Sequence, residues 1–253
     1  LEATGEAGRV SVTAGRSSFT LPALPADEFP AMSGEDLPHR FSMAAADTKS
    51  MIDRTRFAIS NEETRYYLNG IYLHATEAND VAVMRAVATD GHRLARVEMP
   101  LPDGAAGMPA VIIPRKAINE IHKLIENTEG EVSIALSDSK LCFAFGDMVL
   151  TTKLIDGTFP DYERVIPSGN DKTLMVNCKI FANAVDRVAT ISTEKSRSVK
   201  LQMNEGILVL SASSPESGTA REELEISYSA EPMEIGFNSR YLLDIANQIE
   251  GEG

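Results

Sequence analysis

The stretch that decides the fold of this chain is Thr48–Ile59, TKSMIDRTRFAI, because a related stretch occurs again at Lys179–Ile191, KIFANAVDRVATI. Ile52-Asp53-Arg54 in the first copy corresponds to Val185-Asp186-Arg187 in the second, 133 residues further along the chain. In both copies apolar residues recur at the spacing of one face of a helix. We therefore predict an amphipathic helix over each stretch and an internal repeat in the chain.

A second pair of helices extends the repeat. Pro114–Ile125 and Ser239–Ile249 are both predicted to be amphipathic helices, and their first residues match in kind, with Arg115 lying 125 residues before Arg240. The proline that leads the first helix suits a helix start, where its missing N–H costs nothing. Asn238 precedes the second helix as a typical N-cap residue.

A third pair of segments marks the ends of the repeated blocks. Leu24 leads to Phe29-Pro30 as Leu154 leads to Phe159-Pro160, 130 residues later. Three pairs with nearly the same spacing argue against chance resemblance between short segments. We predict three tandem domains of one kind, of which the chain holds the tail of the first at 1–37, the complete second at 38–169, and most of the third at 170–253.

Most of the remaining segments are predicted to be strands, because apolar and polar residues alternate or β-branched residues cluster in them. Many antiparallel strands with a few helices place the chain in the α+β class. The predicted strands are Arg9–Val12, Tyr66–Leu73, Val81–Val87, Ala110–Ile113, Val132–Leu136, Leu141–Phe145, Met148–Lys153, Leu174–Val176, Val199–Met203, Ile207–Ser211 and Leu224–Tyr228.

Composition narrows the class of protein. The chain has 253 residues, of which 43% are hydrophobic, and its 37 acidic and 24 basic residues give a net charge of −13. This balance argues against a protein that binds nucleic acid through a broadly positive surface. No apolar run approaches the roughly 20 residues that a membrane span needs. The start, LEATGEAGRV, has neither a basic leader nor an apolar stretch, and no Met, so we expect part of a longer cytoplasmic protein without a signal peptide.

The sequence offers little that could support catalysis. Cys142 and Cys178 are 36 residues apart without a CxxC pair, and the four histidines are scattered, so we predict inert thiols, no metal site and no cofactor. The phosphate-loop, dinucleotide and nucleophile-elbow motifs do not occur. We therefore expect a protein that is not an enzyme.

Positive charge is concentrated on the predicted helices. Thr48–Ile59 and Pro114–Ile125 each carry +2, Lys179–Ile191 carries +1, and Ser239–Ile249 is neutral. The helices together carry +5, which leaves −18 for the rest of the chain. A positive helical face on a negative body would attract phosphate at one surface only. The alternative is that these lysines and arginines merely keep surface helices soluble.

Several motifs resemble the bacterial sliding clamp family, the beta subunits of DNA polymerase III. The segment Thr89-Asp90-Gly91-His92-Arg93-Leu94-Ala95 looks like the signature of that family, and the other matching segments keep their order over essentially the whole chain. Those segments are Arg65–Gly70, Pro114-Arg115-Lys116, Phe159-Pro160-Asp161-Tyr162, Arg164–Pro167, and Phe237-Asn238 with Tyr241.

The resemblance implies tandem clamp domains whose antiparallel sheets form the outside of a ring and whose paired helices line a central hole. It implies a head-to-tail homodimer of the full-length protein that encircles double-stranded DNA and makes the replicative polymerase processive during DNA replication. The implied partners are DNA of any sequence, the replicative polymerase, the clamp loader and repair polymerases. Linking a polymerase to a ring raises its effective concentration at the primer end without new chemistry.

The resemblance also implies a groove that takes a short hydrophobic peptide from those partners. Carried over by motif, the groove residues are Leu68, Thr89, Gly91, His92, Arg93, Leu94, Pro160, Arg164, Val165, Asn238 and Tyr241. We expect the polar heads of His92, Arg93 and Arg164 at the rim. Ser196 stands where some members of the family have an aromatic residue.

Arg115 and Lys116 are the first candidates for phosphate contact, because they lie on the family motif at the start of an implied inner helix. Arg65 and Tyr66 follow on the same ground. Helix charge alone adds Lys49, Arg54, Arg56, Lys123, Lys179, Arg187 and Arg240.

Two other classes of protein stay open at this stage. A protein-interaction scaffold that never touches DNA would not need its basic helices to share one face. A hydrolase that uses Asp90 and His92 would need a third polar group converging on them in a pocket.

Overall fold

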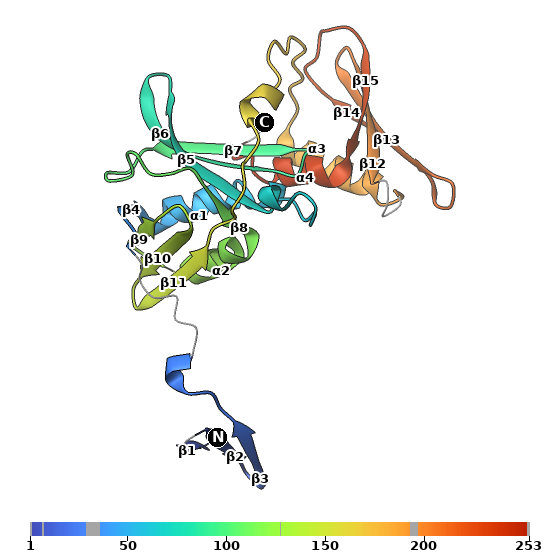
Figure 1. The fold of residues 1–253 in the computed structure, drawn as a ribbon. Helices are drawn as coiled ribbons and strands as arrows, with labels where there is room; N and C mark the ends of the chain where they lie inside the picture. The colour runs from blue at the N-terminus through green and yellow to red at the C-terminus, as the bar shows by residue number, and fades with distance from the viewer. Residues whose placement is uncertain (1, 7, 29–35, 127, 193–196, 252–253) are drawn as a thin grey trace. The chain divides into compact units, whose positions relative to one another are not determined.

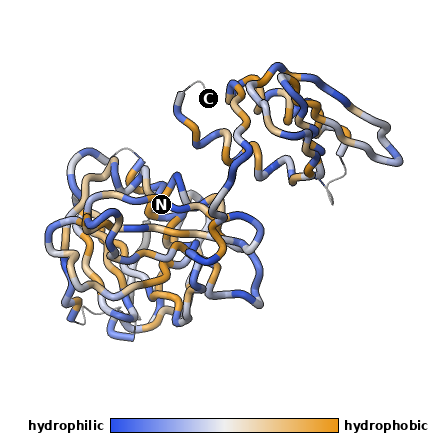
Figure 2. Tube along the Cα trace, turned by 90° about the horizontal axis from the view of Figure 1, so that it is seen from above, coloured by the Kyte–Doolittle hydropathy of each residue, from blue (hydrophilic) through white to orange (hydrophobic). Residues whose placement is uncertain are grey.

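The computed structural model describes residues 2–6, 8–28, 36–126, 128–192 and 197–251 (Figure 1). The chain divides into two compact units, Leu1–Pro38 and His39–Gly253. Within the second unit, hydrophobic stretches run through the interior of the sheets and helices, whereas the turns are hydrophilic (Figure 2). None of the helices in the described ranges is long and apolar enough to cross a membrane.

The first unit is a small antiparallel sheet in the order β1-β2-β3. Its strands are Glu2–Glu6, Arg9–Ala14 and Ser17–Pro22, and a 3₁₀ turn follows at Ala26–Glu28. Strand β2 confirms the strand predicted at Arg9–Val12. The repeat residues Phe29 and Pro30 lie outside the described residues.

Two four-stranded antiparallel sheets share one hydrophobic core in the region 39–153. Their orders are β11-β10-β9-β4 and β7-β6-β5-β8. Helices α1 (Ala45–Asp53) and α2 (Arg115–Ile125) lie side by side against them. The strands are β4 (His39–Ala44), β5 (Gly70–Ala78), β6 (Val81–Thr89), β7 (Leu94–Pro100), β8 (Val111–Pro114), β9 (Glu131–Leu136), β10 (Lys140–Phe145) and β11 (Met148–Lys153).

Each of these sheets takes an edge strand from the other half of the region, since β4 pairs with β9 and β8 pairs with β5. At the second pairing only glycine fits position 70, because a Cβ there would lie 2.2 Å from the carbonyl oxygen of Ile113. The strands β4 and β8 run directly into α1 and α2 without a loop. The position of each helix start is therefore fixed by a sheet edge.

The region 174–251 repeats one half of this plan. Its sheet order β14-β13-β12-β15 corresponds to β7-β6-β5-β8, and Asn238 lies opposite Ser198 as Pro114 lies opposite Gly70. The internal repeat is thereby confirmed. The elements are α3 (Cys178–Ala189), β12 (Ser198–Asn204), β13 (Ile207–Ser214), β14 (Gly218–Glu225), β15 (Met233–Asn238) and α4 (Ser239–Ala246), with a core separate from the first.

All four predicted helices are present; α2 ends at the predicted Ile125, whereas the other three end earlier than predicted. Helix α1 starts before Thr48 and ends at Asp53, where the buried hydroxyl of Thr55 donates to the carbonyl oxygen of Met51 at 2.7 Å. The chain continues as a 3₁₀ turn, η2, at Arg56–Ala58. Helices α3 and α4 also end before the predicted Ile191 and Ile249.

Three strand predictions are wrong in part. Tyr66–Leu68 is a 3₁₀ turn, η3, because the N–H of Leu68 donates to the carbonyl of Arg65 at 2.9 Å before β5 begins. Leu174–Val176 forms only an isolated bridge from Met175 to Ser227, and β14 ends at Glu225. The prediction missed β1, β3, β4, β7 and β15, which are all edge strands in their sheets.

Candidate functional site

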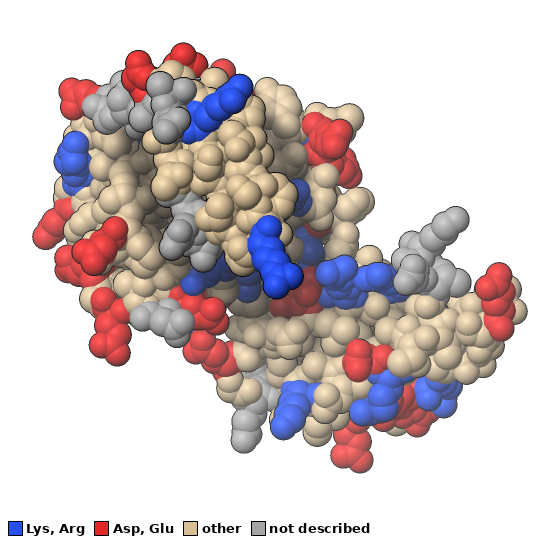
Figure 3. Space-filling view, turned by 90° about the horizontal axis from the view of Figure 1, so that it is seen from below, with Lys and Arg blue, Asp and Glu red and all other residues tan. Residues whose placement is uncertain are grey.

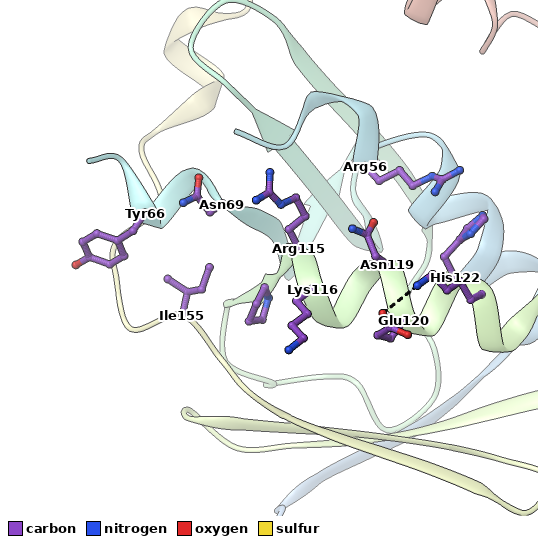
Figure 4. Close-up of a pocket in the computed structure, with 11 residues that line it drawn as sticks. Arg56, Tyr66, Asn69, Arg115, Lys116, Asn119, Glu120, His122 and Ile155 are labelled. Atoms are coloured by element: carbon purple, nitrogen blue, oxygen red, sulfur yellow. Dashed lines mark hydrogen bonds and ion pairs between the residues drawn. The ribbon is translucent and has the colours of Figure 1, made fainter. Parts of the chain in front are cut away.

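The start of α2 forms a basic hollow of about 530 Å³. Arg115 and Lys116 project from the first turn, with Asn69 and Tyr66 beside them and Arg56 reaching over from η2 (Figure 4). Pro114 occupies the N-cap position and supplies no side-chain cap, while the N–H of Arg115 donates to the carbonyl of Asn69 at 2.9 Å. The hollow thus combines exposed cations, an exposed tyrosine and a helix N-terminus.

The predicted DNA-binding cations fall into two groups by their partners. Those further along the helices are paired: Lys49 and Arg56 with Asp53, Arg54 with Glu250, Lys123 with Glu120, and Arg187 with Glu222. In the described ranges, those in the first turns have no carboxylate within ion-pair distance. This second group is Arg115, Lys116, Lys179 and Arg240, and all of them are exposed.

These first turns reverse the usual charge preference of helices. The positive end of a helix dipole favours acidic side chains, yet α2, α3 and α4 have no acidic residue in the first turn and carry Arg115 with Lys116, Lys179 and Arg240 there. Placing cations at these ends costs stability in the absence of a ligand. The same arrangement adds side-chain charge to backbone N–H groups and so favours a bound anion such as phosphate.

Asp53 joins α1 to α2 beneath this face. Its carboxylate lies 2.7 Å from Nζ of Lys49 and 2.8 Å from Nε2 of His122. Burial raises the pKa of Asp53, but the hydrogen bond from Lys49 and the charges of His122, Lys49 and Arg56 outweigh burial and lower it. Asp53 is therefore ionised near pH 7 and reduces the net charge that Lys49 and Arg56 offer to phosphate.

A second site is built around the turn between β6 and β7. The hydroxyl of Thr89 accepts from the N–H of Gly91 at 3.1 Å and donates to the carbonyl of Arg93 at 2.7 Å. The carboxylate of Asp90 accepts from the N–H groups of His92 and Arg93 at 2.9 and 3.1 Å. Asp90 thus closes the turn instead of pairing with the ring of His92, which removes the basis for the hydrolase interpretation.

Gly91 allows this turn to lie close to the side chain of Arg65. Its φ is 87°, and a Cβ there would lie 2.4 Å from Nη1 of Arg65. Arg65 pairs with Glu62 at 2.7 Å and donates to the carbonyl of Asp90 at 3.1 Å. Arg65, predicted as a phosphate contact, therefore braces the turn, and its hydrogen bond with Glu62 raises its own pKa and lowers the pKa of Glu62.

The turn opens onto a groove of about 730 Å³. One side comes from η3 and the turn, and the other comes from the segment around the 3₁₀ turn η4 (Tyr162–Val165). Of the predicted groove residues, the structure brings together Leu68, Thr89, Gly91, His92, Arg93, Leu94, Pro160 and Val165. Sequence reasoning did not assign the further lining residues Arg65, Tyr67, Arg96, Asp161, Tyr162, Ile166 and Pro167 to the groove.

The other predicted groove residues do not line it. Arg164 is exposed and pairs with Asp161 at 2.7 Å, and Asn238 caps α4 by accepting from the N–H of Arg240 at 3.0 Å. Tyr241 lies behind Arg93, whose guanidinium carbon is 4.3 Å from the centre of the tyrosine ring. Ser196 lies outside the described residues.

The guanidinium of Arg93 bonds to other groups of this chain. It donates to the carbonyl of Phe57 at 2.5 Å, pairs with Asp90 at 3.2 Å, and bonds Asp244 in α4. The guanidinium thus bonds two carboxylates and a carbonyl of residues that do not line the groove, although Arg93 itself is a lining residue.

Comparisons with known proteins agree with these motifs. A family model described as "DNA polymerase III beta subunit, central domain" matches residues 42–161, and one described as "DNA polymerase III beta subunit, C-terminal domain" matches residues 163–253. The chain belongs to the bacterial beta sliding clamp family. Members of this family are non-catalytic processivity factors of DNA replication, which confirms the prediction that the chain is not an enzyme.

Individual relatives show the same likeness. The beta sliding clamp of Caulobacter vibrioides is 53% identical over 251 residues, which cover 99% of this chain and 68% of the relative. That of Pseudomonas aeruginosa is 41% identical, over 98% of this chain and 66% of the relative. A crystal structure of a Bartonella birtlesii sliding clamp bound to griselimycin has a TM-score of 0.90 and 52% identity, over 96% of this chain and 66% of that one. The chain thus spans about two thirds of these clamps.

A signal for two of the missed groove residues was present in the sequence. Arg65 and Tyr67 belong to the clamp motif Arg65–Gly70, but the strand predicted from Tyr66 placed Tyr67 in a strand instead of the turn η3. Within the described residues, no group of three or more His, Cys, Asp or Glu side chains is placed to hold a metal ion.

Proposed function

We propose that this chain contributes to a ring around duplex DNA, in which the first turns of its helices face phosphate and the groove holds partner peptides. The observation that carries the proposal is the set of cations at the starts of α2, α3 and α4, in first turns without acidic residues, that have no carboxylate partner among the described residues. Such contacts hold the backbone and read no base, as sliding requires.

Acidic side chains elsewhere on the surface support the same function. They are spread widely over the face shown in Figure 3, while Lys and Arg gather in smaller groups. The net charge of −13 would repel DNA from most of the protein and leave the helix starts as the favourable contact. We assign phosphate contact first to Arg115 and Lys116, and then to Lys179 and Arg240.

We further propose the assembly and partners of the full-length clamp. It would be a head-to-tail homodimer in the cytoplasm, and each of its chains would have three domains. This chain would supply the tail of the first domain at 1–37, the second domain at 38–169 and most of the third domain at 170–253. Its partners would be the replicative polymerase, the clamp loader and repair polymerases. The apolar walls and polar rim of the groove suit a hydrophobic peptide from each.

A topological experiment tests the ring. The full-length clamp is loaded onto nicked circular DNA, and its retention is measured before and after the circle is cut to give free ends. We expect stable retention on the circle and rapid loss from the linear product. Equal retention on both would overturn encirclement and favour the scaffold interpretation.

A further inference from the structure

Arg85 is a buried cation on the central strand β6. Its side chain is 6% exposed, and its neighbours Met84 and Ala86 face the helix-covered core on the opposite side of the sheet. Arg85 therefore points to the other face of the sheet, together with Val87. A buried guanidinium needs several acceptors, because an unpaired buried charge is strongly unfavourable.

Three acceptors surround Arg85, and two of them come from the far wall of the groove. Nη1 donates to the hydroxyl of Tyr162 at 2.7 Å and to the carboxylate of Glu163 at 2.6 Å. Nε donates to Glu98 on the adjacent strand β7 at 2.9 Å. The two wall residues lie 77 and 78 residues further along the chain, in η4.

Aromatic packing completes the attachment of this wall. Phe159 stacks on Tyr72 of β5 with ring centres 4.7 Å apart and planes 4° from parallel. Nε2 of His74 lies 3.0 Å from the hydroxyl of Tyr162. Burial lowers the pKa of His74, so its ring is neutral near pH 7 and Arg85 is the positive group that holds Tyr162.

The anchored segment is the one that shapes the groove. Pro160, Tyr162 and Val165 line the groove, and the residues of η4 other than Tyr162 are exposed. Val165 is 67% exposed, so packing of its own side chain does not hold it in place. The position of Val165 therefore depends on how its neighbours are held, by the bonds of Tyr162 and Glu163 with Arg85 and by the packing of Phe159 on Tyr72.

We propose that Arg85 is a positioning residue for the partner-peptide groove: it fixes the wall Pro160–Val165 against the sheet without touching the peptide. This inference rests on the proposed function of the groove. The wall is preordered by Arg85, and a peptide that meets a preordered wall does not bear the entropy cost of ordering it.

The test measures binding of a fluorescent peptide with the sequence of the replicative polymerase tail to the full-length clamp. Arg85→Met keeps the bulk and removes the donors, and we expect about tenfold weaker binding. Arg85→Lys should restore part of the loss. Tyr162→Phe removes one acceptor and should weaken binding about threefold. Arg221→Met is the matched control, because it makes the same change at an exposed arginine of β14 that pairs with Glu223 outside the groove, and its binding should equal that of the parent.

Amide hydrogen exchange supplies a readout that does not depend on peptide binding. In Arg85→Met, residues 159–167 should exchange faster while β5 and β6 remain protected. Unchanged peptide affinity in Arg85→Met, or an equal loss in Arg221→Met, would overturn the proposal. Should the parent bind no peptide, the proposed groove function fails, and exchange in Tyr162→Phe and Arg85→Met still decides whether Arg85 orders the wall.

Discussion

The regions 39–153 and 174–251 use the same half-domain, a four-stranded sheet with helices against it, but they bury those helices differently. In the first region, α2 lies in a core to which both sheets contribute, and Ile121 is completely buried. In the second, a hollow of about 350 Å³ lined by apolar side chains lies beside α3 and α4, and Ile180 and Ile245 are 54% and 46% exposed. A half-domain of one sheet and its helices can thus form from its own hydrophobic pattern, whereas full burial of its helices requires a second sheet.

The largest expected difference between the regions is in core stability. Ile121→Ala in α2 should lower the free energy of unfolding by about 2–5 kcal/mol, because it leaves a cavity in a closed core. Ile245→Ala in α4 should cost about 0.5 kcal/mol or less, because that side chain is 46% exposed. Urea unfolding of this chain measures both. Equal losses would show that the second region is as closed as the first.

The next largest effect concerns the groove, whose lining residues come from the first region and the segment that follows it. Leu94→Asp should weaken peptide binding about a hundredfold or more, since it places a charge in an apolar wall. Tyr241→Ala from the second region should weaken it about threefold, since it removes a ring that stacks on Arg93 and His92 but does not itself line the groove. Fluorescence anisotropy measures both, and retention on circular DNA should be unchanged in each. A Leu94 variant that folds and binds as tightly as the parent would contradict the groove assignment.

DNA contact tests whether both regions share one phosphate-binding face. In the full-length clamp, Arg115→Glu with Lys116→Glu should reduce the slope of log affinity against log salt by about 2, and Lys179→Glu with Arg240→Glu should do the same. Lys123→Glu is the control, because Lys123 is already paired with Glu120 at 3.0 Å. A salt slope that changes only for the α2 pair would remove the second region from the DNA face.

The smallest effect is the contribution of ion pairs to stability at low pH. The pKa of Asp53 is lowered in the folded chain, so its stabilisation is complete above its unfolded pKa and is lost as the pH falls through the folded value. Asp53→Asn should therefore remove about 1 kcal/mol or less of the stability lost below about pH 4. Glu222→Gln in the second region should change it less, because Glu222 pairs with the exposed Arg187. Thermal unfolding between pH 3 and pH 7 compares the two variants. If Asp53→Asn leaves the loss of stability at low pH unchanged, the stabilising role of the Asp53 carboxylate is refuted.

The sequence predicted helices and strands correctly mainly where one face of the element is buried. Helix α2 was predicted to its last residue because Ala117, Ile118, Ile121 and Ile125 form a regular buried stripe. Strand β15 was missed although Met233, Ile235 and Phe237 alternate with polar residues and glycine, which is the pattern of a strand. Tyr66–Leu68 was taken for strand because tyrosine is a typical strand residue and this turn lies directly before β5.

For the groove, the motif identified the turn residues but not how they are used. Asp90 and Gly91 are required by the turn itself, through local hydrogen bonds and a positive φ that any chain with this sequence would need. The role of Arg93 could not be inferred, because its partners Phe57 and Asp244 are 36 and 151 residues away.

The repeat, the α+β class, the four helices and the clamp motifs are readable from the sequence, because they depend on periodicity and on residues close together in the chain. Only the tertiary structure shows that Arg54 and Arg187 are paired, since their carboxylates lie 196 and 35 residues away in the chain. It also decided that Arg85, in the middle of an ordinary strand, holds the groove wall. Side-chain charge is readable from sequence, but the partner that satisfies it is set by distances through space.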